Sequence, residues 1–259
     1  MFYTSSNNQE LFNNIEAIGL KHEIIDKKDV LIKINMGRPT KNRPRTDMTI
    51  LKTIINYIYQ NGGRCAIAEG SGGYLTENLI DAGFEDMLRR YNIKVIDIDS
   101  EDSEEMLSYG ENHYIPSCFK DYPVRIAIPA ASKREGMIYS NIIKLFVGAV
   151  PRRMYQLNGT DIGGGVPRPK IHLNLHLSVA NLFLAVESYS PFQFFINGGL
   201  SYNENTGEFS FKEVFIGNDA LELDCHIFHN FFNNCEYPEY LDILKNRMSK
   251  SSIQTTKEA

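Results

Sequence analysis

Apolar residues along the chain fall into short continuous runs separated by stripes at helical spacing. Runs of this length, bounded by polar or turn residues, are typical of buried strands. The stretches between them repeat apolar residues every three or four positions, as amphipathic helices do. A sequence of strand, helix, strand, helix and strand within this length predicts a parallel sheet with right-handed crossovers. The expected strands are 29–35, 64–70, 93–99 and 124–130.

The clearest helix begins beside Thr46 and Asp47, two residues suited to cap a helix, and ends at Asn61-Gly62-Gly63. Near Asp219 a strand gives way to another helix within residues 214–232. Further elements follow from the same patterns: helices over 7–20, 76–90, 171–188 and 238–248, and a strand over 192–198.

The chain shows no internal repeat and no low-complexity segment, which favours one domain over several. We expect an α/β fold with a mostly parallel sheet, helices on both faces and loop insertions, formed by residues 1–248. The acidic stretch 98–112 is expected to be an exposed insertion, and the polar residues 249–259 a frayed tail.

Apolar runs and the N-terminal residues bear on the cellular compartment of the protein. No apolar run approaches the roughly 20 residues that a membrane span requires, and the N-terminal residues lack the basic start and apolar stretch of a secretory signal. We therefore predict a cytoplasmic protein whose four cysteines are reduced thiols. Those cysteines form no CxxC or ferredoxin-type spacing, so an iron–sulfur cluster in this chain is not expected.

Charge is distributed unevenly, and this points to a ligand. The chain carries a formal charge of −5, yet residues 31–50 hold five basic side chains against one acidic, and residues 133–170 hold seven against two. An acidic body with two basic segments suits a focused site for a small anion better than a nucleic-acid surface. The alternative is that both segments are solvated loops, as Lys and Arg usually are.

The first candidate ligand group follows the first strand. Lys33 and Asn35 lie two positions apart in an extended segment and so point to one face, and Arg38 stands in the loop after them. In open α/β sheets, ligands bind beyond the carboxyl ends of the strands. Lys33 would supply charge and Asn35 orientation, unless Lys33 simply ends its strand with its amine in water.

The second candidate is the turn "EGSGG" at 69–73. Backbone N–H groups of Ser71, Gly72 and Gly73 could approach an anion at the start of the next helix. Glu69 could act as an acid–base group or pair with a basic residue. The turn is neither a Walker A nor a GxGxxG sequence, and it lacks the GxSxG of a nucleophile elbow, so a tight strand-to-helix turn is an equally good interpretation.

Two pairs of histidines raise the question of a divalent metal. His172 and His176 are four residues apart and would share one helix face, with Asp224 as a candidate third ligand. His226 and His229 form the second pair. No HExxH is present, and the apolar residues between the histidines equally favour a packed core.

The order of these motifs resembles a known family. "VLIKIN", "CAIAEGSGG", "IAIPAASK", "IIKLFVGAVP", "SPFQFFINGG" and "IGNDALELD" together are similar to domain of unknown function 362, over about residues 29–226. The resemblance implies the same α/β fold and a set of family positions. These would be Lys33, Asn35, Ser71, Gly72, Lys133, Lys144, Gly148, Asp219 and Asp224.

The chain also departs from that pattern. Lys133-Arg134-Glu135 replaces the usual Lys-Thr-His, Lys144-Leu145 replaces Lys-Asn, and Asn197 stands where an acidic residue is usual. Some relatives carry a ferredoxin segment with two four-iron clusters, which this chain lacks. A looser likeness in layout joins residues 37–84 to the N-terminal domain of lactate racemase.

The leading hypothesis is therefore an enzyme of unassigned reaction acting on a phosphorylated or carboxylated small molecule in a basic crevice. Its charge would be neutralised by Lys33, Lys133 and Lys144. The candidate catalytic residues are Glu69, Lys133 and Asp219. The alternatives are a non-catalytic binding or partner subunit that kept the pocket, and a metal-dependent transferase or isomerase. Neither nucleic acid nor membrane is an expected partner.

Overall fold

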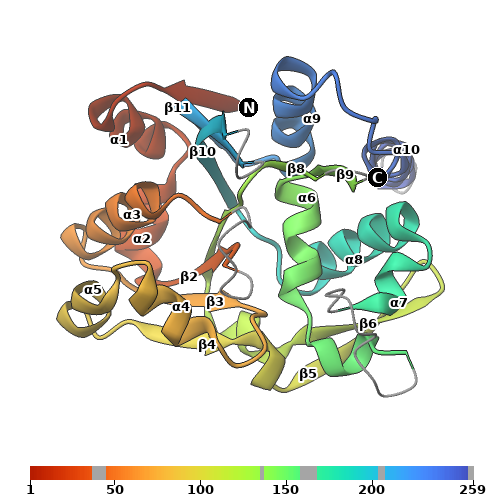
Figure 1. The fold of residues 1–259 in the computed structure, drawn as a ribbon, viewed down its shortest axis with the longest axis horizontal. Coiled ribbons are helices and arrows are strands. Elements are labelled where there is room, and N and C mark those ends of the chain that lie inside the picture. The colour runs from red at the N-terminus through yellow and green to blue at the C-terminus, as the bar shows by residue number, and fades with distance from the viewer. Residues whose placement is uncertain (37–44, 135–136, 158–167, 204–207, 256–259) are drawn as a thin grey trace.

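A computed structural model of the chain describes residues 1–36, 45–134, 137–157, 168–203 and 208–255. Within them, nine strands form one sheet in the order β4-β3-β2-β7-β10-β11-β8-β9, with β1 paired to β11. Helices cover both faces of this sheet (Figure 1). The predicted α/β class with a mostly parallel sheet is confirmed.

The parallel half of the sheet contains the four strands expected early in the chain and one later strand. Its strands pair in parallel throughout, and α3 (Met48–Gln60) connects β2 to β3. Asp47 caps that helix by accepting hydrogen bonds from the N–H groups of Thr49 and Ile50. The strands are β2 (Asp29–Ile34), β3 (Arg64–Glu69), β4 (Lys94–Asp97), β7 (Val124–Ile128) and β10 (Phe194–Asn203).

The other half of the sheet is antiparallel, and the sequence patterns predict only part of it, because the strand expected from residue 214 is the end of β11 whereas β1, β8 and β9 were not expected. Strand β11 pairs antiparallel with β10, β1 and β8, and β8 pairs antiparallel with β9. Strands β1, β8 and β9 are only three or four residues long, so the apolar-run criterion does not detect them. The bounds are β1 (Phe2–Ser5), β8 (Ser132–Arg134), β9 (Met137–Ser140) and β11 (Glu208–Gly217).

Two hydrophobic cores lie on opposite faces of the sheet because strand side chains alternate. In β2, Ile32 belongs to the core under α1 to α5, whereas Leu31 belongs to the core under α6 to α10. The first group of helices is α1 (Asn8–Ala17), α2 (Leu20–Lys27), α4 (Leu75–Asp81) and α5 (Glu85–Arg90), with α3. The second is α6 (Ile142–Leu145), α7 (Pro169–His172), α8 (Leu175–Tyr189), α9 (Ala220–Phe231) and α10 (Tyr240–Thr255).

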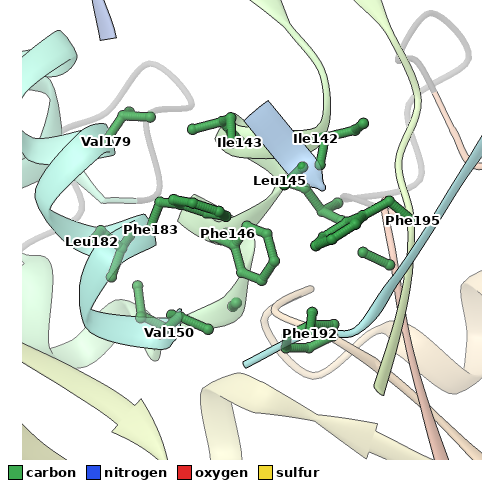
Figure 2. Close-up of a cluster of buried hydrophobic side chains, with 14 of the residues drawn as sticks. Ile142, Ile143, Leu145, Phe146, Val150, Val179, Leu182, Phe183, Phe192 and Phe195 are labelled. Atoms are coloured by element: carbon green, nitrogen blue, oxygen red, sulfur yellow. The ribbon is translucent and has the colours of Figure 1, made fainter. Parts of the chain in front are cut away.

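Helix α6 and the 3-10 turn η3 (Phe146–Ala149) are held in place by aromatic packing (Figure 2). The ring of Phe146 lies 5.4 Å from that of Phe183 in α8 and 5.1 Å from that of Phe192, both nearly edge to face. This packing fixes the segment Asn141–Gly148 over the carboxyl ends of the parallel strands.

Several elements differ from the sequence expectation. Residues 76–90 form two helices, α4 and α5, because Gly83 turns the chain with a φ of +76°. The acidic insertion contains a hairpin, β5 (Ser103–Ser108) and β6 (Glu111–Pro116), that packs on α8 rather than projecting freely. Helix α10 continues to Thr255.

None of the helices in the described residues combines the length and apolar composition needed to cross a bilayer.

Candidate functional site

A buried ion pair joins the carboxyl ends of the two central parallel strands. Lys33 Nζ of β2 lies 2.7 Å from Glu69 Oε2 of β3, and it donates a second hydrogen bond to the carbonyl of Ile34 at 2.8 Å. Lys33 is fully buried and Glu69 is 4% exposed. Of the two roles considered for Glu69, the structure therefore shows the pairing with a basic residue.

Burial shifts both groups of this pair toward their neutral forms. Desolvation lowers the pKa of Lys33, and the charge of Glu69 opposes that shift. Desolvation likewise raises the pKa of Glu69, against the opposing charges of Lys33 and Arg168. A buried pair of this kind is costly to desolvate, so stability alone gives little reason to keep it, and perturbed buried pairs are enriched at functional sites.

The backbone at Gly148 passes directly over this ion pair. A Cβ at Gly148 would come 2.6 Å from Glu69 Oε1 and 3.2 Å from Lys33 Nζ, so only glycine fits. The Gly148 carbonyl accepts a hydrogen bond from the N–H of Gly70, which also donates to Glu69 Oε1. The segment Asn141–Gly148 thus covers the ends of β2 and β3.

Beside the pair, the carboxylate of Asp99 is surrounded by donors. Its Oδ1 accepts from the Arg152 N–H at 2.8 Å and from Arg168 Nη2 at 3.1 Å. Its Oδ2 accepts from the Gly72 N–H at 2.7 Å and lies 3.0 Å from Arg152 Nε. Both arginines are buried, and burial lowers the pKa of Arg168.

Asp97 accepts hydrogen bonds from the other two residues of the glycine turn, Ser71 and Gly73. Its Oδ2 accepts hydrogen bonds from the Ser71 hydroxyl at 2.8 Å and from the Gly73 N–H at 2.6 Å. The groups predicted to orient an anionic ligand, Ser71, Gly72 and Gly73, are therefore bonded to the protein's own carboxylates. We call the surrounding charged residues the edge cluster: Lys33, Glu69, Asp97, Asp99, Arg152, Arg153 and Arg168.

A second buried polar group lies at the start of α6, and we call it the α6 cluster: Tyr139, Asn141, Asn197 and Asp224. Asp224 Oδ1 accepts from the Tyr139 hydroxyl at 2.6 Å, and Oδ2 accepts from the Ile143 N–H at 2.9 Å. Asn141 donates to the Tyr139 hydroxyl and accepts from Asn197. Burial raises the pKa of Asp224 to about 6 despite these hydrogen bonds.

The residues predicted to bind a metal are not brought together. His172 Nδ1 lies 2.9 Å from the carbonyl of Arg168, whereas the His176 ring packs 6.0 Å from the Tyr240 ring. Asp224 has both oxygens engaged in the α6 cluster. Across the part of the chain that the structure describes, no three His, Cys, Asp or Glu side chains are grouped as metal ligands.

Of the remaining predicted residues, Asn35 and Asp219 serve local structure. Asn35 follows β2 and bonds through its backbone to Thr46, while Asp219 is exposed and caps α9 by accepting from the Glu222 N–H. Lys144 lies half-buried in α6. Lys133 lies in β8, but its side chain is outside what the structure describes, and Arg38 lies outside the described residues.

The sequence patterns did not single out Asp97 or Asp99, and Arg152 and Arg168 counted only among the seven basic residues of 133–170. A usable signal was present, because "IDID" places Asp97 and Asp99 at the end of a predicted strand, the same position that Glu69 has in its own strand. The carboxyl-edge rule applies equally to all neighbouring parallel strands.

The sequence matches the family described as "Domain of unknown function (DUF362)" over residues 30–229. The chain belongs to this family. Among solved structures, it is similar to the lactate racemase apoprotein from Thermoanaerobacterium thermosaccharolyticum, with a TM-score of 0.52 and 14% identity. That likeness covers 80% of this chain and 51% of the racemase chain, so the DUF362 chain spans about half the racemase's length.

At this identity the racemase likeness shows a shared fold only. No curated protein matches the sequence. Both resemblances expected from the motifs are confirmed.

Proposed function

We propose that this DUF362 protein binds a small anion, phosphorylated or carboxylated, at the carboxyl edge of β2, β3 and β4. The observation that carries the proposal is a set of buried cations at this edge: Lys33, Arg152 and Arg168 are 0%, 8% and 2% exposed. Arg153 is exposed, so the buried part of the edge cluster holds these three cations beside the carboxylates of Glu69, Asp97 and Asp99. Buried cations whose carboxylate partners can be exchanged favour an anionic ligand.

Lys144 adds a further positive charge, next to a histidine, His172, that is kept neutral. Burial is the main cause that lowers the pKa of His172, and the charges of Lys144 and Arg168 lower it further. His172 Nδ1 lies 2.9 Å from the carbonyl of Arg168, and we therefore place Lys144, whose charge acts on the same ring, on the α6 side of the edge cluster. We assign Lys144 and Arg168 to charge neutralisation of the ligand, and Glu69 to proton transfer once ligand binding separates it from Lys33.

The fold likeness suggests which anions to test first. The similar structure is that of a lactate racemase, and lactate is a small carboxylate. Carboxylates and phosphates share the geometry that arginine recognises. We therefore place short hydroxy and oxo carboxylates beside inorganic phosphate in a ligand panel.

A non-catalytic binding subunit is the second candidate, and one observation favours it. Lys33 and Glu69 neutralise each other while buried, as a structural pair would. The two candidates differ in turnover: a binding subunit would hold the anion unchanged, whereas an enzyme would release a product.

The test is anion binding by the wild type, Lys144→Met and a matched control, Lys94→Met. Lys94 is exposed on β4, away from α6. Phosphate or a short carboxylate should raise the melting temperature of the wild type and the control. Loss of the Lys144 charge should weaken binding about tenfold, the scale of one charge-assisted contact. A panel in which no anion binds the wild type would contradict the proposal.

A further inference from the structure

The donors around Asp99 form a complete recognition site for a carboxylate or phosphate. Two backbone N–H groups, of Gly72 and Arg152, and two guanidinium groups, of Arg152 and Arg168, converge on its two oxygens within 3.1 Å. Main-chain N–H groups combined with arginine are the usual donors in phosphate and carboxylate sites. We call these four groups the donor set.

The donor set is held in place without any help from Asp99. Arg168 Nε donates to the carbonyl of Val150, and Arg152 Nη2 donates to the carbonyl of Gly70 at 3.0 Å. The guanidinium groups therefore keep their positions through backbone contacts. An empty donor set would still present two positive charges and two N–H groups.

Glycines allow the arginines to lie against the turn. Gly72 has a φ of +73°, and a Cβ there would approach Arg152 Nη1 to 2.6 Å; a Cβ at Gly70 would clash with Arg168. The glycines of "EGSGG" thus allow the arginines to approach the turn closely. Of the turn's own groups, only the Gly72 N–H belongs to the donor set.

Asp99 itself comes from a short element at the edge of the sheet. It lies in the 3-10 turn η1 (Ile98–Ser100), where Ser100 is exposed. Within the described part of the chain, the hydrogen bonds of its carboxylate all go to the donor set. Ile98 of this turn is buried and the Asp99 N–H donates to Asp97 Oδ1, so we expect the carboxylate to leave by rotation of the Asp99 side chain.

We propose that the donor set is the anion site of this protein and that Asp99 is its internal occupant, displaced when a phosphate or carboxylate binds. This inference rests on the proposed function and deepens it, because it names the contacts and adds an autoinhibitory carboxylate. A phosphate would offer three or four oxygens to the same donors, and Asp99 would move into water. No covalent step is involved.

The test compares inorganic phosphate and acetate binding to the wild type, Asp99→Ala and Asp97→Ala by calorimetry. Removing the occupant should tighten anion binding at least tenfold. Asp97→Ala is the matched control, because it removes the same charge two residues away and frees Ser71, the Gly73 N–H and the Asp99 N–H, but no arginine. Adding Arg168→Met to Asp99→Ala should abolish the gain. If the alanine variant does not fold, Asp99→Asn, which has nearly the same shape, replaces it in the experiment. Its anion affinity should also rise, by a smaller factor.

Hydrogen exchange of the wild type provides the second arm. Phosphate at saturating concentration should speed amide exchange in η1, because the turn loses its contacts, while α3 stays unchanged. A folded Asp99→Ala that binds no tighter than the wild type would overturn the inference, as would wild-type binding with unaltered exchange in η1. In either case, anion binding weakened by Lys144→Met would leave the broader proposed function standing, whereas no wild-type binding would remove both.

Discussion

The edge cluster and the α6 cluster are both buried and polar, yet they satisfy their charges in different ways. In the edge cluster, carboxylates meet Lys33, Arg152 and Arg168, so charge is balanced by charge. In the α6 cluster, Asp224 meets only neutral donors, a phenol and a backbone N–H. In the edge cluster, a charged ligand could replace one member of an ion pair, as ligand binding requires. In the α6 cluster, the carboxyl group is held by neutral donors and connects elements of the structure.

The segment Asn141–Gly148 links the two clusters. Its first residues bond to Asp224 and Asn197, and its last residue lies over Lys33 and Glu69. The α6 cluster therefore anchors one end of the element that covers the edge cluster. Substitutions in the two clusters should differ in size and in their response to pH.

The largest effect should come from breaking the Lys33–Glu69 pair. Glu69→Gln leaves a buried lysine without its counter-charge and should lower the free energy of unfolding by about 3–5 kcal/mol, measured by urea denaturation. The double variant Lys33→Met/Glu69→Leu removes both charges and should lose much less. As a control, Arg64→Met breaks the exposed pair with Asp29 and should cost under about 1 kcal/mol. Equal losses for the single and double variants would refute a coupled pair.

The next effect concerns pH and separates the α6 cluster from the edge cluster. The pKa of Asp224 is about 6 in the folded state, above its ordinary 3.8, so folding favours the protonated form. This stabilisation is complete below about pH 4 and is lost as the pH rises through 6, a change of about 3 kcal/mol.

Asp224→Asn cannot titrate, so the wild type should lose stability relative to this variant between pH 4 and 7. Urea denaturation of both proteins at each pH measures the difference. Glu187, whose burial raises its pKa to about 7, is present in both and cancels. A difference that stays constant with pH would show that Asp224 does not titrate in this range.

The smallest effect tests the turn of the edge cluster. Gly72→Ala meets both a φ of +73° and the Arg152 guanidinium, whereas Gly73→Ala meets a φ of +92° in open space. We expect a loss of about 1–2 kcal/mol from backbone strain in each, and a further loss only in Gly72→Ala. Thermal denaturation of the two variants measures the gap, and equal melting temperatures would argue against close packing of Arg152 on the turn.

The parallel half of the fold followed from the sequence because its strands are buried on both faces and appear as continuous apolar runs. The carboxyl-edge rule then brought Lys33, Glu69 and Ser71 to one place. The antiparallel strands β8 and β9 could not be predicted in this way, since they have only three and four residues. The break between α4 and α5 was missed because the left-handed conformation of Gly83 is not visible in the hydrophobic pattern.

The partners within the site were harder to predict than its location. Spacing on one expected helix suggested that His172 and His176 share a metal, with Asp224 as a third ligand. The three residues instead lie in α7, α8 and α9, and Asp224 bonds to α6. Likewise, "SGG" has the flexibility of an anion-binding turn, yet the sequence does not show that Asp97 and Asp99 occupy it. Which donor meets which acceptor depends on how separate elements pack, and no local pattern records that.

Calorimetric titration of the wild-type protein with phosphate and short carboxylates tests most directly whether the edge cluster is an anion site. We predict saturable binding of at least one of these anions, with one anion bound per chain. Titrations that remain flat for every member of the panel would contradict the account and leave the edge cluster a structural ion-pair network.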